Sequence, residues 1–277
     1  MTSVSHSAVA PGRNVSAKPF LVVSDLHLGA VPEAREHQFR ELLRYAADNA
    51  SGLLINGDLF DVWLASRHFV VRRHVRVLAA LADLADAGVP VYVVGGNHDP
   101  LELGRHALED FGAIPLTEPA RLQLGAWRAL VIHGDGVLRD GASYPRYVKR
   151  HPLLRSATFR WAAERLLHLD RIYDRVDKWS TTSRQVARHL RGEDAGPKPD
   201  AAPIAAWAMA ALRAEPATDI VLAGHSHSPA VVDAGGGRYY VNSGDWISHM
   251  IVVVLPADRG APELRVWPDG MRDVGAP

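Results

Sequence analysis

Short apolar runs recur along the chain, and each has the length of one buried strand. The runs are FLVV (20–23), GLLIN (52–56), VPVYVVGG (89–96), WRALVIHGD (127–135) and DIVLAGHSH (219–227). They are rich in the β-branched and aromatic residues that favour strands, and they are apolar at nearly every position rather than at alternate ones. We therefore predict five strands, of which the first is buried.

Between the first three runs, the apolar residues change to a helical spacing. Residues 33–49 carry one apolar stripe, and residues 67–87 carry a second before Gly88, which we expect to end that helix. The stripes are Phe39, Leu42, Leu43 and Ala46, then Val71, Val75, Leu78, Leu81, Leu84 and Ala85. Strands that alternate with helices predict parallel βαβ units. After residue 228, the runs RYYVNSG and MIVVVLP predict a meander.

Length and composition place the chain among soluble globular proteins of one large or two small domains. It has 277 residues, of which 47% are hydrophobic and 22% charged. The absence of Cys excludes disulfides and thiolate metal sites. No apolar run reaches the length of a membrane span, and the first 18 residues lack the apolar segment of a secretory signal. We expect residues 1–18 to form a flexible tail and the protein to be cytoplasmic.

The formal net charge of zero argues against a general nucleic-acid binder. It conceals a basic segment, because residues 139–191 contain 13 Lys and Arg against 5 Asp and Glu. This segment also has helical periodicity and many large apolar residues, and the Gly- and Pro-rich stretch 192–203 follows it. We predict a helical cap, 137–200, inserted into a core made of 19–136 and 201–277. The basic side chains suggest an anionic partner, and a solvated helical face is the alternative.

Each predicted strand is followed by one or two residues that can bind a metal, namely Asp, Asn or His. They are Asp25 and His27, then Asp58, then Asn97 and His98, then His133, and finally His225 and His227. Ligand sites of α/β sheets lie at the carboxyl ends of strands. A single Asp or His in such a place could shape a turn, but eight at five strand ends favour a metal site. Oxygen and nitrogen ligands suit Mn, Fe, Zn or Mg.

The motifs DLH, GDLFD, GGNHD, HGD and GHSH, in this order, resemble those of the calcineurin-like metallophosphoesterases. The resemblance implies an α/β fold of two packed β-sheets flanked by helices, with two divalent metal ions, of which we expect Mn first. It implies that one ion is held by Asp25, His27 and His227. The other ion is then held by Asn97, His133 and His225, and Asp58 bridges the two. A bridging carboxylate also reduces the repulsion between two ions roughly 3.5–4 Å apart.

In the family's motif, the residue at His98 orients the phosphate or protonates the leaving oxygen. We expect Asp99 to hold the His98 imidazole in the useful tautomer. For Asp61 a helix start and a supporting role stay open. For Asp135, orientation of His133 and formation of a turn stay open.

A narrower resemblance rests on GDLFDVW, HGDGVLRDGASYPRYVKRHPL and SGDW, which are similar to segments of the UDP-2,3-diacylglucosamine diphosphatases of lipid A biosynthesis. It implies cleavage of a nucleotide-linked lipid to UMP and 2,3-diacylglucosamine 1-phosphate, with acyl chains bound by the cap. Tyr144, Ser183 and Arg184 are then candidates for substrate contact. A peripheral contact with the cytoplasmic face of the inner membrane would suit this substrate.

His98 departs from the motif of the UDP-2,3-diacylglucosamine diphosphatases, because some members of that group have Arg at this position. This leaves open a phosphoesterase for another substrate, such as a cyclic nucleotide or a phosphoprotein. A binding scaffold without activity is a further alternative, although every expected ligand is present.

Overall fold

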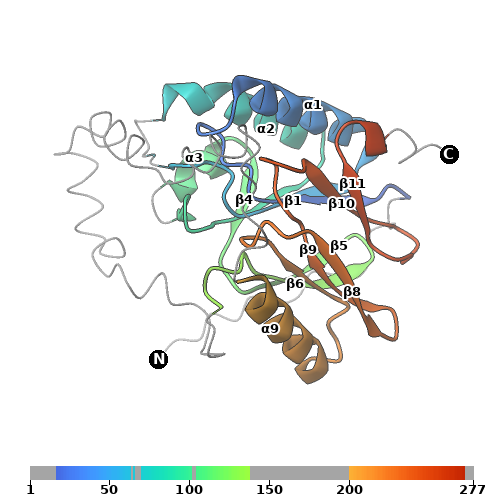
Figure 1. Ribbon diagram of the computed structural model, residues 1–277. Helices are drawn as coiled ribbons and strands as arrows, with labels where there is room; N and C mark the ends of the chain where they lie inside the picture. The colour runs from blue at the N-terminus through green and yellow to red at the C-terminus, as the bar shows by residue number, and fades with distance from the viewer. Residues whose placement is uncertain (1–16, 64, 66–69, 102–103, 138–199, 272–277) are drawn as a thin grey trace, which may run out of the picture.

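The computed structural model describes residues 17–63, 65, 70–101, 104–137 and 200–271 (Figure 1). Two β-sheets lie face to face at its centre, and helices cover the outer face of each. The predicted architecture of two packed sheets flanked by helices is therefore confirmed.

The six-stranded sheet contains the first three predicted strands as neighbours. Its order is β11-β10-β1-β2-β3-β4. Strands β1 to β4 are parallel, whereas β10 is antiparallel to β1 and β11 to β10. The bounds are β1 Phe20–Val23, β2 Gly52–Asn56, β3 Val91–Val94, β4 Ala113–Leu116, β10 Ile251–Leu255 and β11 Glu263–Val266.

The five-stranded sheet has the order β5-β6-β7-β9-β8. Its three inner strands are parallel, and both edge strands run antiparallel to their neighbours. The bounds are β5 Ala120–Leu124, β6 Trp127–Val131, β7 Ile220–Ala223, β8 Ala230–Gly235 and β9 Arg238–Asn242. The predicted meander is wrong, because β9 and β10 lie in different sheets.

The helices form the two outer layers. Helices α1 (Glu33–Asn49), α2 (Val75–Asp86) and α3 (Arg105–Asp110) belong to the connections between strands of the six-stranded sheet, and α9 (Ala201–Ala214) packs on the five-stranded sheet. Two short 3₁₀ helices are η1 (Arg72–His74) and η3 (Asp269–Met271). Helix α2 begins at Val75, later than predicted, and Val75 is 45% exposed. It therefore does not belong to the buried stripe, in which Val77 takes part instead.

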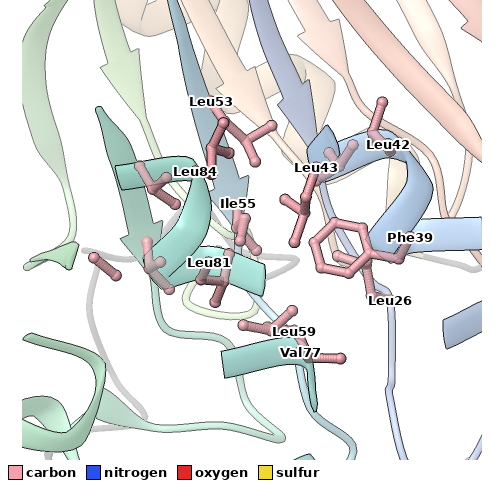
Figure 2. Packing of buried hydrophobic residues seen from close by; sticks show 14 of the residues in the cluster. Leu26, Phe39, Leu42, Leu43, Leu53, Ile55, Leu59, Val77, Leu81 and Leu84 are labelled. Carbon is pink, nitrogen blue, oxygen red and sulfur yellow. The ribbon is translucent and has the colours of Figure 1, made fainter. Parts of the chain in front are cut away.

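The unbroken apolar run of β1 is explained by its two buried faces. Successive side chains of a strand point to opposite sides of the sheet. Leu21 and Val23 pack with α1 and α2, whereas Phe20 and Val22 pack against the five-stranded sheet. Figure 2 shows the helix side, where leucines of α1 and α2 meet residues of β2. Complete burial of one such side chain contributes about 1.5–3 kcal/mol.

Helix α9 closes the other outer face. Its buried residues Ile204, Ala208 and Leu212 pack on Leu130 and Val221 of the five-stranded sheet. The four layers are thus helices, sheet, sheet and helix, with an apolar core between each pair.

Most of the predicted tail (1–18) and of the predicted cap (137–200) falls outside the described residues, as do Tyr144, Ser183 and Arg184. Those predictions stay open. Within the described part of the chain, no helix has the length and apolar character needed to cross a bilayer.

Candidate metal centre

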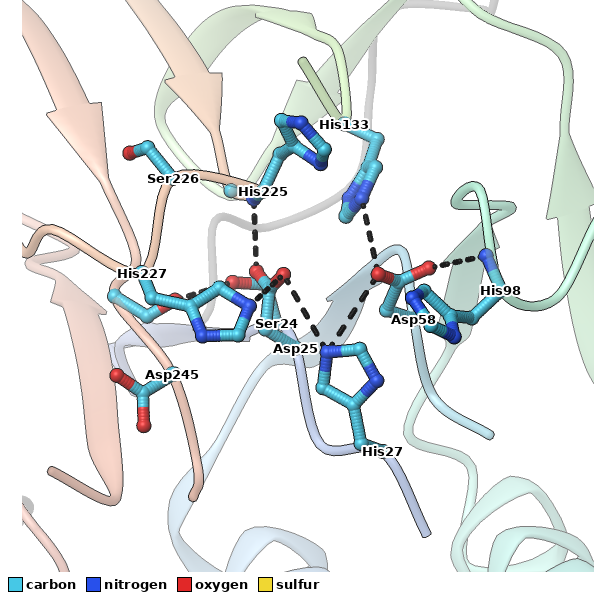
Figure 3. Close-up of polar contacts among 12 residues, drawn as sticks. Ser24, Asp25, His27, Asp58, His98, His133, His225, Ser226, His227 and Asp245 are labelled. Carbon is cyan, nitrogen blue, oxygen red and sulfur yellow. Dashed lines mark hydrogen bonds and ion pairs between the residues drawn. The ribbon is translucent and has the colours of Figure 1, made fainter. Parts of the chain in front are cut away.

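The polar residues that follow five strands come together at one end of both sheets. Three of these strands (β1, β2 and β3) belong to one sheet and two (β6 and β7) to the other. Hydrogen bonds join the loops: the Asp25 N–H donates to the Gly57 carbonyl, and the His225 N–H donates to the Asp25 side-chain Oδ2 at 2.9 Å. Figure 3 shows the resulting ring of carboxylates and imidazoles.

Asp25, His27 and His227 form the first group whose ligand atoms lie close enough to share a cation. His227 Nε2 is 3.1 Å from Asp25 Oδ1, and His27 Nε2 is 4.0 Å from the same oxygen. Asp25 is completely buried. Burial disfavours its charge, but the facing His227 outweighs burial and holds the pKa of Asp25 below its usual range.

Asp58 lies between this group and His133. Its Oδ2 is 3.6 Å from His27 Nε2 and 3.4 Å from His133 Nε2. Asp58 also belongs to two further groups of suitable geometry, one with Asp25 and His133 and one with His27 and His98. Although burial opposes both charges, the contact with His133 lowers the pKa of Asp58 well below its usual range and raises the pKa of His133.

The orientation of the His133 ring is fixed by the main chain. Its Nδ1 lies 3.0 Å from the Asn56 carbonyl oxygen, which can only accept, so Nδ1 carries the proton. Nε2 then points toward Asp58 and is the ring nitrogen left for a cation. Asp135 therefore has no part in the hydrogen bond that orients this ring.

Several buried polar atoms in this space make no well-aligned hydrogen bond among the described residues, although His227 Nε2 lies 3.1 Å from Asp25 Oδ1. They are Asp25 Oδ1, His27 Nε2, Asn97 Oδ1, His133 Nε2 and His227 Nε2. Buried polar groups are nearly always satisfied, so such a set calls for a missing partner. Because its members are oxygen and imidazole nitrogen atoms, the set fits a divalent cation.

The backbone is strained at the same residues. Asp25, His27, Asp58, His225 and His227 all have φ between 47° and 63°. Residues other than glycine seldom adopt this left-handed region, and each instance costs of order 1 kcal/mol. Gly96 shows how closely the chain approaches the site, since a Cβ there would lie 2.1 Å from Asp58 Oδ1.

His98 lies beside Asp58 on the third loop. Its N–H donates to Asp58 Oδ1 at 2.9 Å, and its ring Nδ1 lies 3.2 Å from Asp61 Oδ1. Burial lowers the pKa of His98, but the Asp61 and Asp58 carboxylates outweigh it and raise the pKa to about 9. In the metal-free protein, these two carboxylates therefore favour the protonated imidazole.

The role predicted for Asp99 is carried by Asp61 instead. The Asp99 carboxylate accepts the N–H groups of Asp58, Phe60 and Gly96 at 2.8–3.2 Å, so it holds the loops rather than the His98 ring. Burial and the charge of Asp58 raise the pKa of Asp99 to about 7. Asp61 is buried within a loop and lies near both His98 and His27, so it does not start a helix.

His225 is brought to the site, with its ring centroid 5.3 Å from that of His133. It is not a member of the three close groups found among the described residues. Its Nε2 lies 3.6 Å from Asp200 Oδ2.

Sequence reasoning missed two supporting carboxylates, Glu118 and Asp245. Glu118 accepts the N–H of His133, and burial raises its pKa well above the usual value. Asp245 is buried, and its carboxylate accepts the Ser248 N–H and lies 2.7 Å from His249 Nδ1; the adjacent Trp246 donates its N–H to the Asp25 carbonyl. The segment SGDW was a signal for Asp245, whereas Glu118 lies in no motif.

Comparisons with known proteins identify the family to which this chain is similar. A family model described as calcineurin-like phosphoesterase matches residues 18–229. A UDP-2,3-diacylglucosamine hydrolase of Ralstonia nicotianae is 31% identical, over 82% of this chain and 84% of its own length. One of Bordetella parapertussis is 33% identical, over 76% and 78%. Among solved structures, the phosphoesterase Yfce of E. coli is 15% identical, with a TM-score of 0.44 over 91% of this chain and 94% of its own.

Proposed function

This chain belongs to the calcineurin-like phosphoesterase family and is a metal-dependent hydrolase, and from this premise we propose that it cleaves the pyrophosphate of UDP-2,3-diacylglucosamine. The products are UMP and 2,3-diacylglucosamine 1-phosphate. We infer this substrate because relatives named UDP-2,3-diacylglucosamine hydrolase align with more than three quarters of this chain.

The observation that carries the hydrolytic function is the set of buried atoms without partners that face one another at the strand ends. We assign Asp25, His27 and His227 to one ion and Asn97, His133 and His225 to the other, with Asp58 between them. Mn is the first candidate, with Fe, Zn and Mg as alternatives. Two ions held by these residues would withdraw charge from the phosphoryl oxygens and lower the pKa of a bound water.

His98 supplies the proton for the departing oxygen. Its Nδ1 faces the Asp61 carboxylate and the Asp61 carbonyl oxygen, which lies 3.1 Å away, so the transferable proton is on Nε2. Asp61 keeps this imidazole charged and limits its rotation. The same positive charge attracts the phosphate before reaction, which gives one residue an orienting and an acidic role.

The lipid part of the substrate is proposed to meet the segment 137–200, where Tyr144, Ser183 and Arg184 are the candidate contacts. Peripheral attachment to the cytoplasmic face of the inner membrane, without nucleic acid as a partner, belongs to the same proposal.

The test is release of UMP from UDP-2,3-diacylglucosamine by the full chain loaded with Mn. We expect turnover by the wild type, loss of activity and of both ions in Asp58→Ala, and wild-type behaviour in Asp83→Ala. Asp83 is the control because it is exposed on α2.

Hydrolysis of a generic aryl phosphodiester without UMP release would discard the lipid substrate and keep the phosphoesterase. An active Asp58→Ala variant that still binds two ions would remove the bridging assignment.

A further inference from the structure

Asp200 occupies the position before the first turn of α9, yet its side chain does not serve that helix. Aspartate at this position usually accepts an N–H of the first turn. Here the side chain makes no such bond, and the main chain begins the helix through the Asp200 carbonyl, which accepts the Ile204 N–H at 3.1 Å. The carboxylate is therefore available for another partner.

That partner is His225, whose Nε2 lies 3.6 Å from Asp200 Oδ2. Gly134, which follows β6, lies close to both His225 and the start of α9. A Cβ at Gly134 would lie 3.3 Å from the His225 Cβ and 3.0 Å from Ile204 Cδ1. The main chain of His225 is held by Asp25, and its ring is next to that of His133. Asp200 thus approaches the ring from the helix side.

We propose that Asp200 is a positioning residue for His225, an inference that rests on the proposed two-metal function. A carboxylate beside Nε2 favours the tautomer that has its proton on this nitrogen. The lone pair of Nδ1 then binds the cation, and the contact with Asp200 restricts rotation of the imidazole ring. Carboxylates that accept the second N–H of a ligating histidine act in this way in metal sites generally.

Ligation of the cation through Nε2 of His225, instead of Nδ1, predicts a different result. If His225 ligates through Nε2, Asp200 competes with the cation for that nitrogen. Removal of the carboxylate would then leave metal affinity unchanged or increase it.

The experiment is a titration of the metal-free full chain with Mn²⁺ and with Zn²⁺ by calorimetry, for the wild type and three variants at Asp200. Asp200→Ala and Asp200→Ser both lose the carboxylate, and Ser still suits the start of a helix. Asp200→Asn keeps an oxygen that can accept the N–H. Asp48→Ala is the matched control, since Asp48 is exposed in the last turn of α1.

We expect one of two binding steps to weaken about 10- to 100-fold in Asp200→Ala and Asp200→Ser. Asp200→Asn and Asp48→Ala should resemble the wild type. In the Zn-loaded proteins, ¹⁵N spectra should find the His225 proton on Nε2 in the wild type and in Asp200→Asn.

Equal affinities in wild type and Asp200→Ser, or a proton on Nδ1, would overturn the role of Asp200 while two ions still bind. A wild type that binds fewer than two ions would instead overturn the two-metal function itself.

Discussion

Gly57 offers a direct test of how tightly the metal centre is built. It lies between β2 and Asp58 with φ of +87°, and a Cβ at this position would lie 2.1 Å from His133 Nδ1. Gly88 has nearly the same backbone, with φ of +82°, but a Cβ there would meet nothing within 4 Å. Gly57→Ala and Gly88→Ala therefore share the same backbone strain, but only the Cβ of Gly57→Ala collides with a side chain, the His133 ring.

The two costs can be separated in magnitude. Alanine in the left-handed region costs about 1–2 kcal/mol, which both variants should lose from their free energy of unfolding. Gly57→Ala must also displace the His133 ring, and overpacking of this kind costs about 1–3 kcal/mol more. The displaced ring loses its bond to the Asn56 carbonyl and moves Nε2 away from Asp58.

Urea unfolding of the metal-free proteins measures the first effect, and calorimetric titration with Mn²⁺ measures the second. We expect Gly57→Ala to be the less stable of the two and to lose metal affinity and turnover, whereas Gly88→Ala keeps both functional properties. Equal stabilities together with wild-type metal binding in Gly57→Ala would refute the claim that His133 has no room to move.

Three other predictions concern single side chains. His98→Ala should keep both ions by metal analysis and lose about 10²-fold or more in kcat; a rate near that of the wild type would remove its acidic role. Asp99→Ala should lose about 3 kcal/mol or more of unfolding free energy in urea, because three backbone amides lose their acceptor, and Asp99→Asn should lose less. Arg128 hydrogen-bonds Asp219 and lowers its pKa to about 2. At pH 7, Asp219→Asn should be less stable by about 1 kcal/mol, and this difference should disappear as pH falls from about 4, the usual pKa of Asp, through 2. A difference that does not change with pH would contradict this explanation.

The sequence by itself determined the local units of this protein. Apolar runs and the helical stripe of 33–49 predicted β1, β2, β3 and α1 closely. The spacing of apolar residues within a short segment indicates which of its faces is buried. The parallel arrangement of β1, β2 and β3 followed from the alternation of strands and helices, whereas their order in the sheet did not. The polar residues after β1, β2 and β3 could be gathered for the same reason, since parallel strands end at the same edge of a sheet, whereas those after β6 and β7 come from the second sheet.

Only the tertiary structure decided which distant segments become neighbours. The local pattern of β10 suits a strand in either sheet, and its pairing with β1 depends on burying both of its faces between layers. The partner of His98 is likewise Asp61 rather than the adjacent Asp99, because three backbone amides already surround the Asp99 carboxylate. Val75 is the first residue of α2 and is exposed, and Asp200 meets His225 because α9 packs on the five-stranded sheet. A side chain's partner depends on how layers pack in three dimensions, and residue order constrains that packing only where the connection between elements is short.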